Sequence, residues 1–510
     1  MTVEEAHIIR LHDGDNVAIA RRCIEQGATI AGTCIEARDK IPPGHKIALR
    51  PIMKGEPILK YNQIIGFASQ NIDAGAHVHT HNSEIQPFHR NHEPCSEVRQ
   101  TNYIPVPEQA TFEGYVRESG QVGTRNYLGI LTSVNCSATV ARHIAEVINR
   151  SGELDDYPHV DGVVALVHGT GCGMEAGGEA HEILERVLAG YARHPNFAGV
   201  LIIGLGCEVC QVGGISKNYG LDDSKNFRTM TIQETGGTRR TIERGVAALR
   251  DMLPNANQVR RQSVPASHLT LALQCGGSDA YSGVSANPAL GAAVDLLVRH
   301  GGSAILSETP EIYGAEHLLT LRAATPEIAE KLMERIHWWE DYTARSGGEM
   351  NNNPSPGNKE GGLTTILEKS LGAVAKGGTT NLVDVYRYAE PLTSAGFAFM
   401  DSPGYDPVSV TGQVAAGANV ICFTTGRGSV FGFKPVPSIK LATTSSLYMR
   451  MQEDMDINCG VIVDGTSTVQ QMGAAIFARI LEVASGEKTC SERLGFGDDE
   501  FAPWQIGAVM

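Results

Sequence analysis

Four cysteines of this 510-residue chain follow apolar segments, each at the point where a strand would end: Cys136, Cys172, Cys207 and Cys275. Successive members are 36, 35 and 68 residues apart, close to one or two strand–helix units, so all four thiols are expected at one sheet edge. Thiolates bind soft metal ions such as iron or zinc. Glu208, beside Cys207, adds a carboxylate to this set. The alternative is that each cysteine is a small buried hydrophobic residue near a strand end.

Three histidines alternate along a second segment, at positions 77, 79 and 81. Residues i, i+2 and i+4 of a strand share one face, so the imidazoles of His77, His79 and His81 should line up. Imidazole is a good ligand for iron or zinc. His79 and His81 are therefore candidate metal ligands, and His79 is also a candidate acid–base catalyst. The alternative is a solvated edge strand.

Two carboxylates are candidates for a catalytic base. Asp279 closes the segment Cys275–Asp279, and Glu308 lies in Ser307–Glu311, each after an apolar stretch. Paired carboxylates such as those of Glu308 and Glu311 can serve as metal ligand and general base. Without that role, Ser307–Glu311 would be the solvated start of a helix.

Two further segments offer positive charge for an anionic substrate. Asn353–Gly362 is rich in small residues and precedes a predicted helix, so its backbone amides and Lys359 form a candidate anion site. Arg427, in Thr424–Gly428, follows a predicted strand and offers a bidentate clamp for a carboxylate. A structural ion pair is the alternative for this arginine.

Composition and missing motifs exclude several classes. No Gly-x-Gly-x-x-Gly follows the first strand of the α/β region and no Gly-x-Ser-x-Gly follows a predicted strand, which disfavours a nicotinamide dehydrogenase and an α/β-hydrolase. The chain has 42 Lys and Arg against 57 Asp and Glu, a net charge of −15, which argues against nucleic-acid binding. No apolar run approaches the ~20 residues of a membrane span, and Met1–Glu5 lacks signal-peptide features. A cytoplasmic protein with free thiols and no membrane partner is expected.

The elements that must position these residues fall into three regions. Residues 1–85 contain short β-segments separated by turns, which predicts a small all-β module, and residues 86–110 form a proline-containing linker. From residue 111, strands and amphipathic helices alternate, which predicts parallel sheet, and a break near residues 255–267 separates 111–262 from 263–510. The fold class is α/β with a small N-terminal all-β module. Predicted strands include Leu128–Val134, Gly162–His168, Val200–Gly206, Leu269–Gln274 and Val420–Phe423, and predicted helices include Ala138–Asn149 and Thr364–Ala375.

Five motifs together resemble the altronate/galactarate dehydratase family over nearly the whole chain: Gly123–Asn126, Gly204–Glu208, Cys275–Asp279, Asn353–Lys359 and Thr425–Gly428. The resemblance implies a β-clip (SAF) module in residues 1–85, a dimer-forming middle domain and a Rossmann-like catalytic domain. It also implies a homodimer and activity with Fe²⁺ under reducing conditions, with Mn²⁺ or another divalent ion as the alternative. The expected substrate-binding residues in these motifs are Arg125, Asn126, Ser278, Asn358, Lys359 and Arg427.

The expected reaction removes water from a sugar acid, most simply D-altronate to 2-keto-3-deoxy-gluconate. A divalent metal would stabilise the enediolate and the leaving hydroxide, and positioned acids and bases would move the protons. The expected metal ligands come from His79, His81, Cys172, Cys207, Glu208 and Cys275, and the expected catalytic residues are Asp279, Glu308, Lys359, Arg427 and His79. Segment 77–82 resembles altronate-type members of the family more than galactarate-type members, which favours altronate as the substrate. A sulfolactate sulfo-lyase, whose two parts are usually separate chains, and a non-catalytic sugar-acid-binding protein are the competing interpretations.

Overall fold

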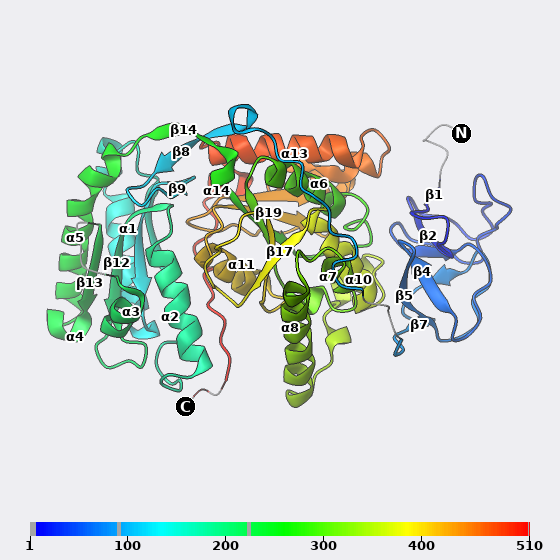
Figure 1. Ribbon diagram of the computed structural model, residues 1–510, viewed down its shortest axis with the longest axis horizontal. Helices are drawn as coiled ribbons and strands as arrows, with labels where there is room; N and C mark the ends of the chain where they lie inside the picture. The colour runs from blue at the N-terminus through cyan, green and yellow to red at the C-terminus, as the bar shows by residue number, and fades with distance from the viewer. Residues whose placement is uncertain (1–6, 89–92, 222–225, 508, 510) are drawn as a thin grey trace.

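Three units lie in a row along the longest axis of the molecule (Figure 1). The computed structural model describes residues 7–88, 93–221, 226–507 and 509. An all-β module lies at one end, a unit with a seven-stranded sheet in the middle, and a unit with a four-stranded sheet at the other end. The predicted fold class is therefore confirmed. Within the described ranges, no helix combines the length and apolarity needed to cross a bilayer.

The β module consists of two small antiparallel sheets. Their strands are β1 (Ile8–Ile9), β2 (Val17–Ala20), β3 (Lys46–Ala48) and β6 (His77–Val78) in one sheet, and β4 (Pro57–Lys60), β5 (Gln63–Ala68) and β7 (Ser83–Glu84) in the other. One side of the module has its own core, which includes Ile30 and Ile47. The other side, with Ile58 and Val78, is continuous with the core of the central unit. The module is thus packed onto the central unit by shared apolar burial.

The four-stranded unit is a parallel sheet with helices on both faces. In spatial order its strands are β11 (Gly162–Leu166), β10 (Tyr127–Thr132), β12 (Phe197–Gly204) and β13 (Phe227–Thr231). Its helices are α1 (Ala138–Arg150), α2 (Glu179–Ala192), α3 (Val212–Tyr219), α4 (Ile232–Thr235) and α5 (Thr238–Gln258). Helices α1 and α5 pack on one face, while α2 and α3 pack on the other, where α2 also contacts the central unit.

The central unit contains a seven-stranded, all-parallel sheet. In spatial order its strands are β17 (Leu382–Tyr386), β18 (Phe397–Met400), β16 (Ser303–Leu306), β15 (Thr270–Cys275), β19 (Val420–Thr425), β20 (Ser438–Ala442) and β21 (Ile457–Asn458). Its helices are α6 (Ala286–Arg299), α7 (His317–Thr320), α8 (Pro326–Arg345), α9 (Pro356–Glu360), α10 (Ile366–Val374), α11 (Asp406–Ala415), α12 (Ser445–Arg450), α13 (Val469–Ala484) and α14 (Cys490–Leu494). Strands such as β19 are buried along their whole length, because helices cover both faces.

A small antiparallel sheet connects the two α/β units and was not predicted from the sequence. It consists of β14 (Arg261–Pro265), β8 (Thr111–Val116) and β9 (Val122–Gly123). Helix α5 was also missed, and it occupies much of the interval before the predicted break. Strand β14 follows it and pairs with β8, so the chain crosses between units twice at this sheet.

Each parallel sheet has one position where the chain reverses its direction of winding. In the central sheet, β15 is followed in sequence by β16 on one side, whereas β19, on its other side, is followed by β20. In the four-stranded sheet the same relationship holds for β10 and β12. Such a position is called a switch point. Ligands of open α/β sheets bind there, in the crevice at the carboxyl ends of the strands. The molecule therefore offers two places of this kind.

Candidate active site

The loops that follow β15 and β19 meet at the switch point of the central sheet. The carbonyl oxygen of Gly277 accepts hydrogen bonds from the backbone N–H groups of Gly426, at 3.1 Å, and Arg427, at 2.9 Å. A side chain at Gly426 would collide with the carboxylate of Asp279, since an added Cβ would lie 2.2 Å from its Cγ. This close approach requires glycine at position 426 and fixes the two loops together.

The carboxylate of Asp279 is fully engaged by this loop. Its Oδ1 accepts from the backbone N–H groups of Tyr281 and Ser282 and from the Ser282 hydroxyl, and its Oδ2 accepts from Thr443. Burial raises the pKa of Asp279 above its ordinary value. Four hydrogen bonds thus occupy the carboxylate oxygens of Asp279 and hold the site in shape. A proton taken up by Asp279, as its predicted role of catalytic base requires, would compete with them.

The β module docks beside this loop through buried charges. Lys46 Nζ lies 2.8 Å from Glu368 Oε2, and Lys60 Nζ lies 2.9 Å from Oε1 of the same carboxylate. Although burial favours the neutral acid, the two ammonium groups hold the pKa of Glu368 far below its ordinary value. Removing one partner of a buried pair leaves an uncompensated charge, so these contacts fix the orientation of the module. Tyr281 adds a hydrogen bond from its hydroxyl to the carbonyl of Ala20, at 2.8 Å.

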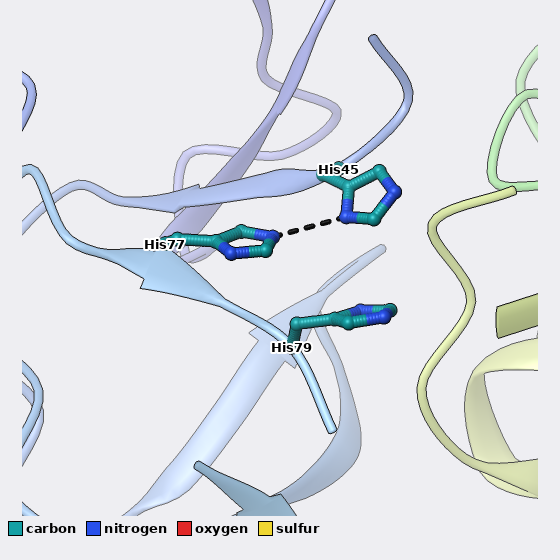
Figure 2. Close-up of side chains that lie close together, drawn as sticks. All are labelled: His45, His77 and His79. Atoms are coloured by element: carbon teal, nitrogen blue, oxygen red, sulfur yellow. Dashed lines mark hydrogen bonds between the residues drawn. The ribbon is translucent and has the colours of Figure 1, made fainter. Parts of the chain in front are cut away.

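Three imidazoles of the module converge at this docked face (Figure 2). One nitrogen from each of His45, His77 and His79 lies within 4.8 Å of the other two. Nδ1 of His45 is 3.0 Å from Nε2 of His77, and Nε2 of His45 is 3.1 Å from the carbonyl oxygen of Glu360 in the central unit. The prediction placed His81 in this group, but its side chain is exposed and His45 completes the set. His45 was missed because it is a single histidine on another strand.

The electrostatic setting keeps these rings neutral. Burial, followed by the effect of His45, lowers the pKa of His77 to about 4. Burial, followed by the charge of Lys46, lowers the pKa of His79 to about 3. Nδ1 of His79 is also buried without a hydrogen-bond partner among the described residues. Neutral imidazoles with free lone pairs are the form that binds transition metals.

A second cluster of ionisable groups lies at the carboxyl ends of β15 and β16. A ligand atom of each of Cys275, Glu308 and Glu311 lies within 4.8 Å of the other two, and all three residues are buried. Lys376 donates to Cys275 Sγ at 2.8 Å, and Lys369 donates to Glu311 at 2.7 Å. The two lysines had no sequence signal, because each lies on or just after helix α10, far along the chain from its partner.

Glu308 is the member of this cluster whose carboxylate makes the fewest polar contacts. Its backbone has a φ of 71°, and neither carboxylate oxygen has a hydrogen-bond partner in the described structure. The closest cation is Lys376, at 3.8 Å. Burial, followed by the charge of Glu311, raises the pKa of Glu308 well above its ordinary value. A buried acid with a strained backbone and no hydrogen bond to its carboxylate is the kind of group found at functional sites.

Asp406, at the start of α11, borders the same cluster and was not predicted. Its side chain is partly exposed, and an added Cβ at Gly276 would lie 2.4 Å from its Oδ2. Burial, followed by the charge of Glu311, raises the pKa of Asp406 to about 7. A carboxylate with a pKa near neutrality is suited to proton transfer.

The predicted anion-binding residues divide into two groups. Arg427 is exposed and lies 3.1 Å from Glu360, and Lys359 is partly exposed on α9 beside it. Asn358, in contrast, caps α9 and donates to the carbonyl oxygen of Ser278 at 2.8 Å. Arg427 and Lys359 are thus available to a ligand, whereas Asn358 and Ser278 hold the two loops together.

Arg125 and Asn126, which were predicted to bind substrate, lie away from this edge and make structural contacts. Both precede β10 and lie at the amino end of that strand, whereas ligand sites form at the carboxyl ends. Arg125 is buried in a bidentate pair with Glu492. Asn126 donates to the carbonyl oxygen of Ala256 at 3.0 Å. These residues connect structural elements.

The expectation that four thiols share one sheet edge is also wrong. Cys275 ends a strand of the central sheet, whereas Cys136, Cys172 and Cys207 follow strands of the four-stranded sheet. Both carboxylate oxygens of Glu208, a predicted metal ligand, are occupied by hydrogen bonds. One oxygen accepts from Ser133 Oγ at 2.7 Å, and the other accepts from the N–H of Gly206 at 2.6 Å. Spacing along the chain gave the length of the units correctly but could not show where one sheet stops and the next begins.

Comparison with known proteins gives matches along almost the whole chain. Residues 6–86 match the altronate/galactarate dehydratase SAF domain, residues 114–257 the second domain of D-galactarate dehydratase/altronate hydrolase, and residues 266–509 the C-terminal domain of D-galactarate/altronate dehydratase. The chain is 36% identical to altronate dehydratase of Bacillus subtilis (strain 168), over 98% of this chain and 99% of that protein. It is 39% identical to galactarate dehydratase (L-threo-forming) of Escherichia coli (strain K12), over 96% and 95%. It is also 31% identical to (2R)-sulfolactate sulfo-lyase subunit beta of Chromohalobacter salexigens, over 76% and 95%.

Proposed function

The chain belongs to the altronate/galactarate dehydratase family and is a hydro-lyase of the sugar-acid dehydratase type; from this premise we propose that it dehydrates D-altronate to 2-keto-3-deoxy-gluconate. The reaction removes the hydrogen from C2 and the hydroxyl from C3, and the resulting enol tautomerises to the keto acid with release of one water. The observation that carries the proposal is the meeting of the three imidazoles, the exposed cations and the buried acids around one switch point.

The residues present fit the divalent metal that such a dehydratase would use. The donor set of His45, His77 and His79 is neutral and includes a buried nitrogen without a partner among the described residues, which suits Fe²⁺. A bound ferrous ion would act as a Lewis acid toward substrate oxygens. The group of Cys275, Glu308 and Glu311 suits a cation less, because Lys369 and Lys376 already supply two positive charges there.

The substrate carboxylate would be held by Arg427 and Lys359. Arg427 currently pairs with Glu360, an exposed contact in which Arg427 keeps about half of its side chain accessible. Exposed pairs are worth only about 0–1 kcal/mol, so a ligand carboxylate can replace Glu360 at little cost. A bidentate arginine contact would then fix the plane of the carboxylate next to C2.

Two carboxyl groups with different pKa values would move the protons. Asp406, with a pKa near 7, is ionised in a large fraction of molecules at neutral pH and would accept the C2 proton. Glu308, whose pKa lies well above its ordinary value, carries a proton and would donate it to the departing C3 hydroxyl. Separated pKa values in one site identify the base and the acid. The sequence offered Asp279 or Glu308 as the base; the proposal instead assigns Asp406 as base and Glu308 as acid.

A second candidate activity is that of a sulfo-lyase, and likeness to both subunits of such an enzyme favours it. Both subunits of (2R)-sulfolactate sulfo-lyase from Chromohalobacter salexigens resemble parts of this chain, the alpha subunit at 34% identity over 82 residues and the beta subunit over 390. Loss of sulfite would follow the same C2 deprotonation, with a carbon–sulfur bond breaking in place of carbon–oxygen.

The deciding experiment compares substrates anaerobically, with ferrous iron and a thiol reductant present. D-altronate, galactarate and (2R)-sulfolactate are supplied separately, and 2-keto acid and sulfite are measured. Keto acid from D-altronate supports the proposal. Keto acid from galactarate alone would overturn the choice of substrate, and sulfite alone would replace the dehydratase by a sulfo-lyase.

A further inference from the structure

The four-stranded sheet has a switch point of its own, and thiols surround it. Cys136 follows β10 and Cys207 follows β12, the two strands between which the winding reverses, and Cys172 follows β11 on the other side of β10. All three side chains are exposed. Neighbouring strands lie about 4.8 Å apart, so three consecutive strand ends place these loops side by side.

Direct contacts hold the three loops together. The N–H of Asn135 donates to the carbonyl oxygen of Thr170, and the N–H of Cys210 donates to that of Gly171, both at 3.0 Å. Gly171 has a φ of 102°, and an added Cβ would lie 2.0 Å from the carbonyl oxygen of Ser133. The loop that carries Cys172 is therefore pressed onto the loop that carries Cys136, and only glycine permits this approach.

The electrostatic environment favours anionic sulfur. Helix α1 begins at Ala138, two residues after Cys136, and its first turn has no side-chain cap. Its uncapped N–H groups and the positive end of its dipole are free to stabilise thiolate. The nearby carboxylate of Glu208 adds no ligand, because three hydrogen bonds from Ser133, Leu205 and Gly206 hold it in the loop.

A cavity of about 530 Å³ opens beside two of these thiols. Cys136 and Cys172 line it, together with Asn135, Thr170 and, from the C-terminal segment, Trp504. Ligand pockets have volumes of roughly 300–1,000 Å³, so the space is large enough for a prosthetic group and a small molecule next to it.

We propose that Cys136, Cys172 and Cys207 bind an iron–sulfur cluster at this second switch point. Among the described residues these three sulfur atoms do not all lie within 4.8 Å of one another, so they do not surround a single ion, whereas a polynuclear cluster holds its thiolate ligands further apart. A closed zinc site would also need a fourth protein ligand. The closest further cysteine in sequence, Cys210, is buried in the core and has no access to the cavity.

The number of ligands determines what the cluster could do. With three protein thiolates, one iron of a four-iron cluster keeps a coordination position open, and the cavity gives it access to a small oxygen ligand. Assembly takes ferrous and ferric iron in equal amounts, together with sulfide, from solution, so that the mixed-valent cluster forms without a further oxidant. Each of the three thiols releases one proton on ligation. This site is separate from the imidazole group of the β module and does not depend on the proposed dehydratase activity.

The test is anaerobic reconstitution of the full chain with ferrous and ferric iron in equal amounts, sulfide and a thiol. Expected results are a broad visible charge-transfer absorption and iron and acid-labile sulfide in equal amounts, each above one per chain. Cys136→Ser, Cys172→Ser and Cys207→Ser should each reduce the bound cluster at least about tenfold, since even the loss of an outer contact lowers metal affinity by roughly 10–100-fold. Cys34→Ser, at an exposed thiol of the β module, is the matched control and should retain the cluster.

The outcomes that would overturn the proposal are distinct from failure of the dehydratase assay. Iron without sulfide, zinc in preference to iron, or equal cluster content in Cys136→Ser and Cys34→Ser would each refute the cluster. The far-ultraviolet circular dichroism of every variant must match the parent protein, and His79→Ala should keep the cluster absorption. Neither readout requires turnover, so a protein inactive on D-altronate can still confirm or refute the site.

Discussion

The ring of His45 and the backbone of Glu360 are joined by a hydrogen bond of 3.1 Å, although they lie 315 residues apart. A carbonyl oxygen only accepts, so Nε2 of His45 must carry the proton and Nδ1 must present a lone pair. His77 Nε2, 3.0 Å from that nitrogen, is then the donor. The backbone of the central unit thus sets the tautomer of a histidine in the β module, and Nδ1 of His45 is the nitrogen that would bind the proposed metal ion.

Replacement of His45 tests this assignment. His45→Ala should weaken binding of ferrous iron to the imidazole group at least about tenfold, because one of three nitrogens is lost and His77 loses its partner. His81→Ala, which removes an exposed ring, should leave the affinity within a factor of about two of the parent protein. Metal titration by calorimetry under anaerobic conditions measures both. Equal losses in the two variants would contradict the choice of His45 over His81.

The pH dependence of turnover tests Asp406. The base must be ionised, so kcat/KM should rise as pH increases through about 7, the pKa of Asp406, and fall again only where Glu308, the acid, loses its proton. Asp406→Asn should lower kcat by about 10²–10⁴-fold and abolish this rising limb. Asp464→Asn, at an exposed aspartate near the start of α12, is the control. An unchanged limb in Asp406→Asn would assign the titration to another group.

Glu308 is tested by the neutral isostere. Glu308→Gln keeps size and shape but has no proton to donate to the leaving hydroxyl, so kcat should fall about 10²–10⁴-fold. KM and iron content should change little, because the side chain binds neither. Glu340→Gln, at an exposed glutamate of α8, should remain fully active. A large drop in iron content of Glu308→Gln would instead indicate that this buried group is the metal site.

The docking of the β module is tested at Glu368. Glu368→Gln leaves Lys46 and Lys60 buried without a counter-charge and should destabilise the docked module by about 3–5 kcal/mol. Glu56→Gln removes an ion pair with Arg50, in which the two side chains are 31% and 49% exposed, and should change stability by less than about 1 kcal/mol. Urea unfolding and the rate of limited proteolysis report the difference. If the two variants behaved alike, the buried triad would not be what fixes the module.

The sequence was most informative where a pattern is local. The predicted strands Leu128–Val134 and Val420–Phe423 correspond to β10 and β19, because each is a short segment rich in apolar residues. The predicted helix Ala138–Asn149 corresponds to α1 to within one residue. Such signals arise within a few residues and need no knowledge of distant contacts.

The site depends on contacts that no local pattern encodes. His45 is an isolated histidine that pairs with His77 only because β3 and β6 are neighbours in a sheet. Lys376 reaches Cys275 across 101 residues. Arg125 shows the converse, since it lies in a specific family motif but forms a buried ion pair with Glu492. Motifs identify residues that matter, and only the three-dimensional arrangement separates binding from support.

The buried contact of Glu368 with Lys46 and Lys60 has a consequence for gene architecture. Recognition between the β module and the rest of the protein is encoded in the interface, where these buried charges pair. A single polypeptide and two co-expressed polypeptides can therefore build the same active site. Fusion or fission of the two coding regions would be close to neutral for catalysis, and the relatives that resemble this chain in separate pieces are what such a history would leave.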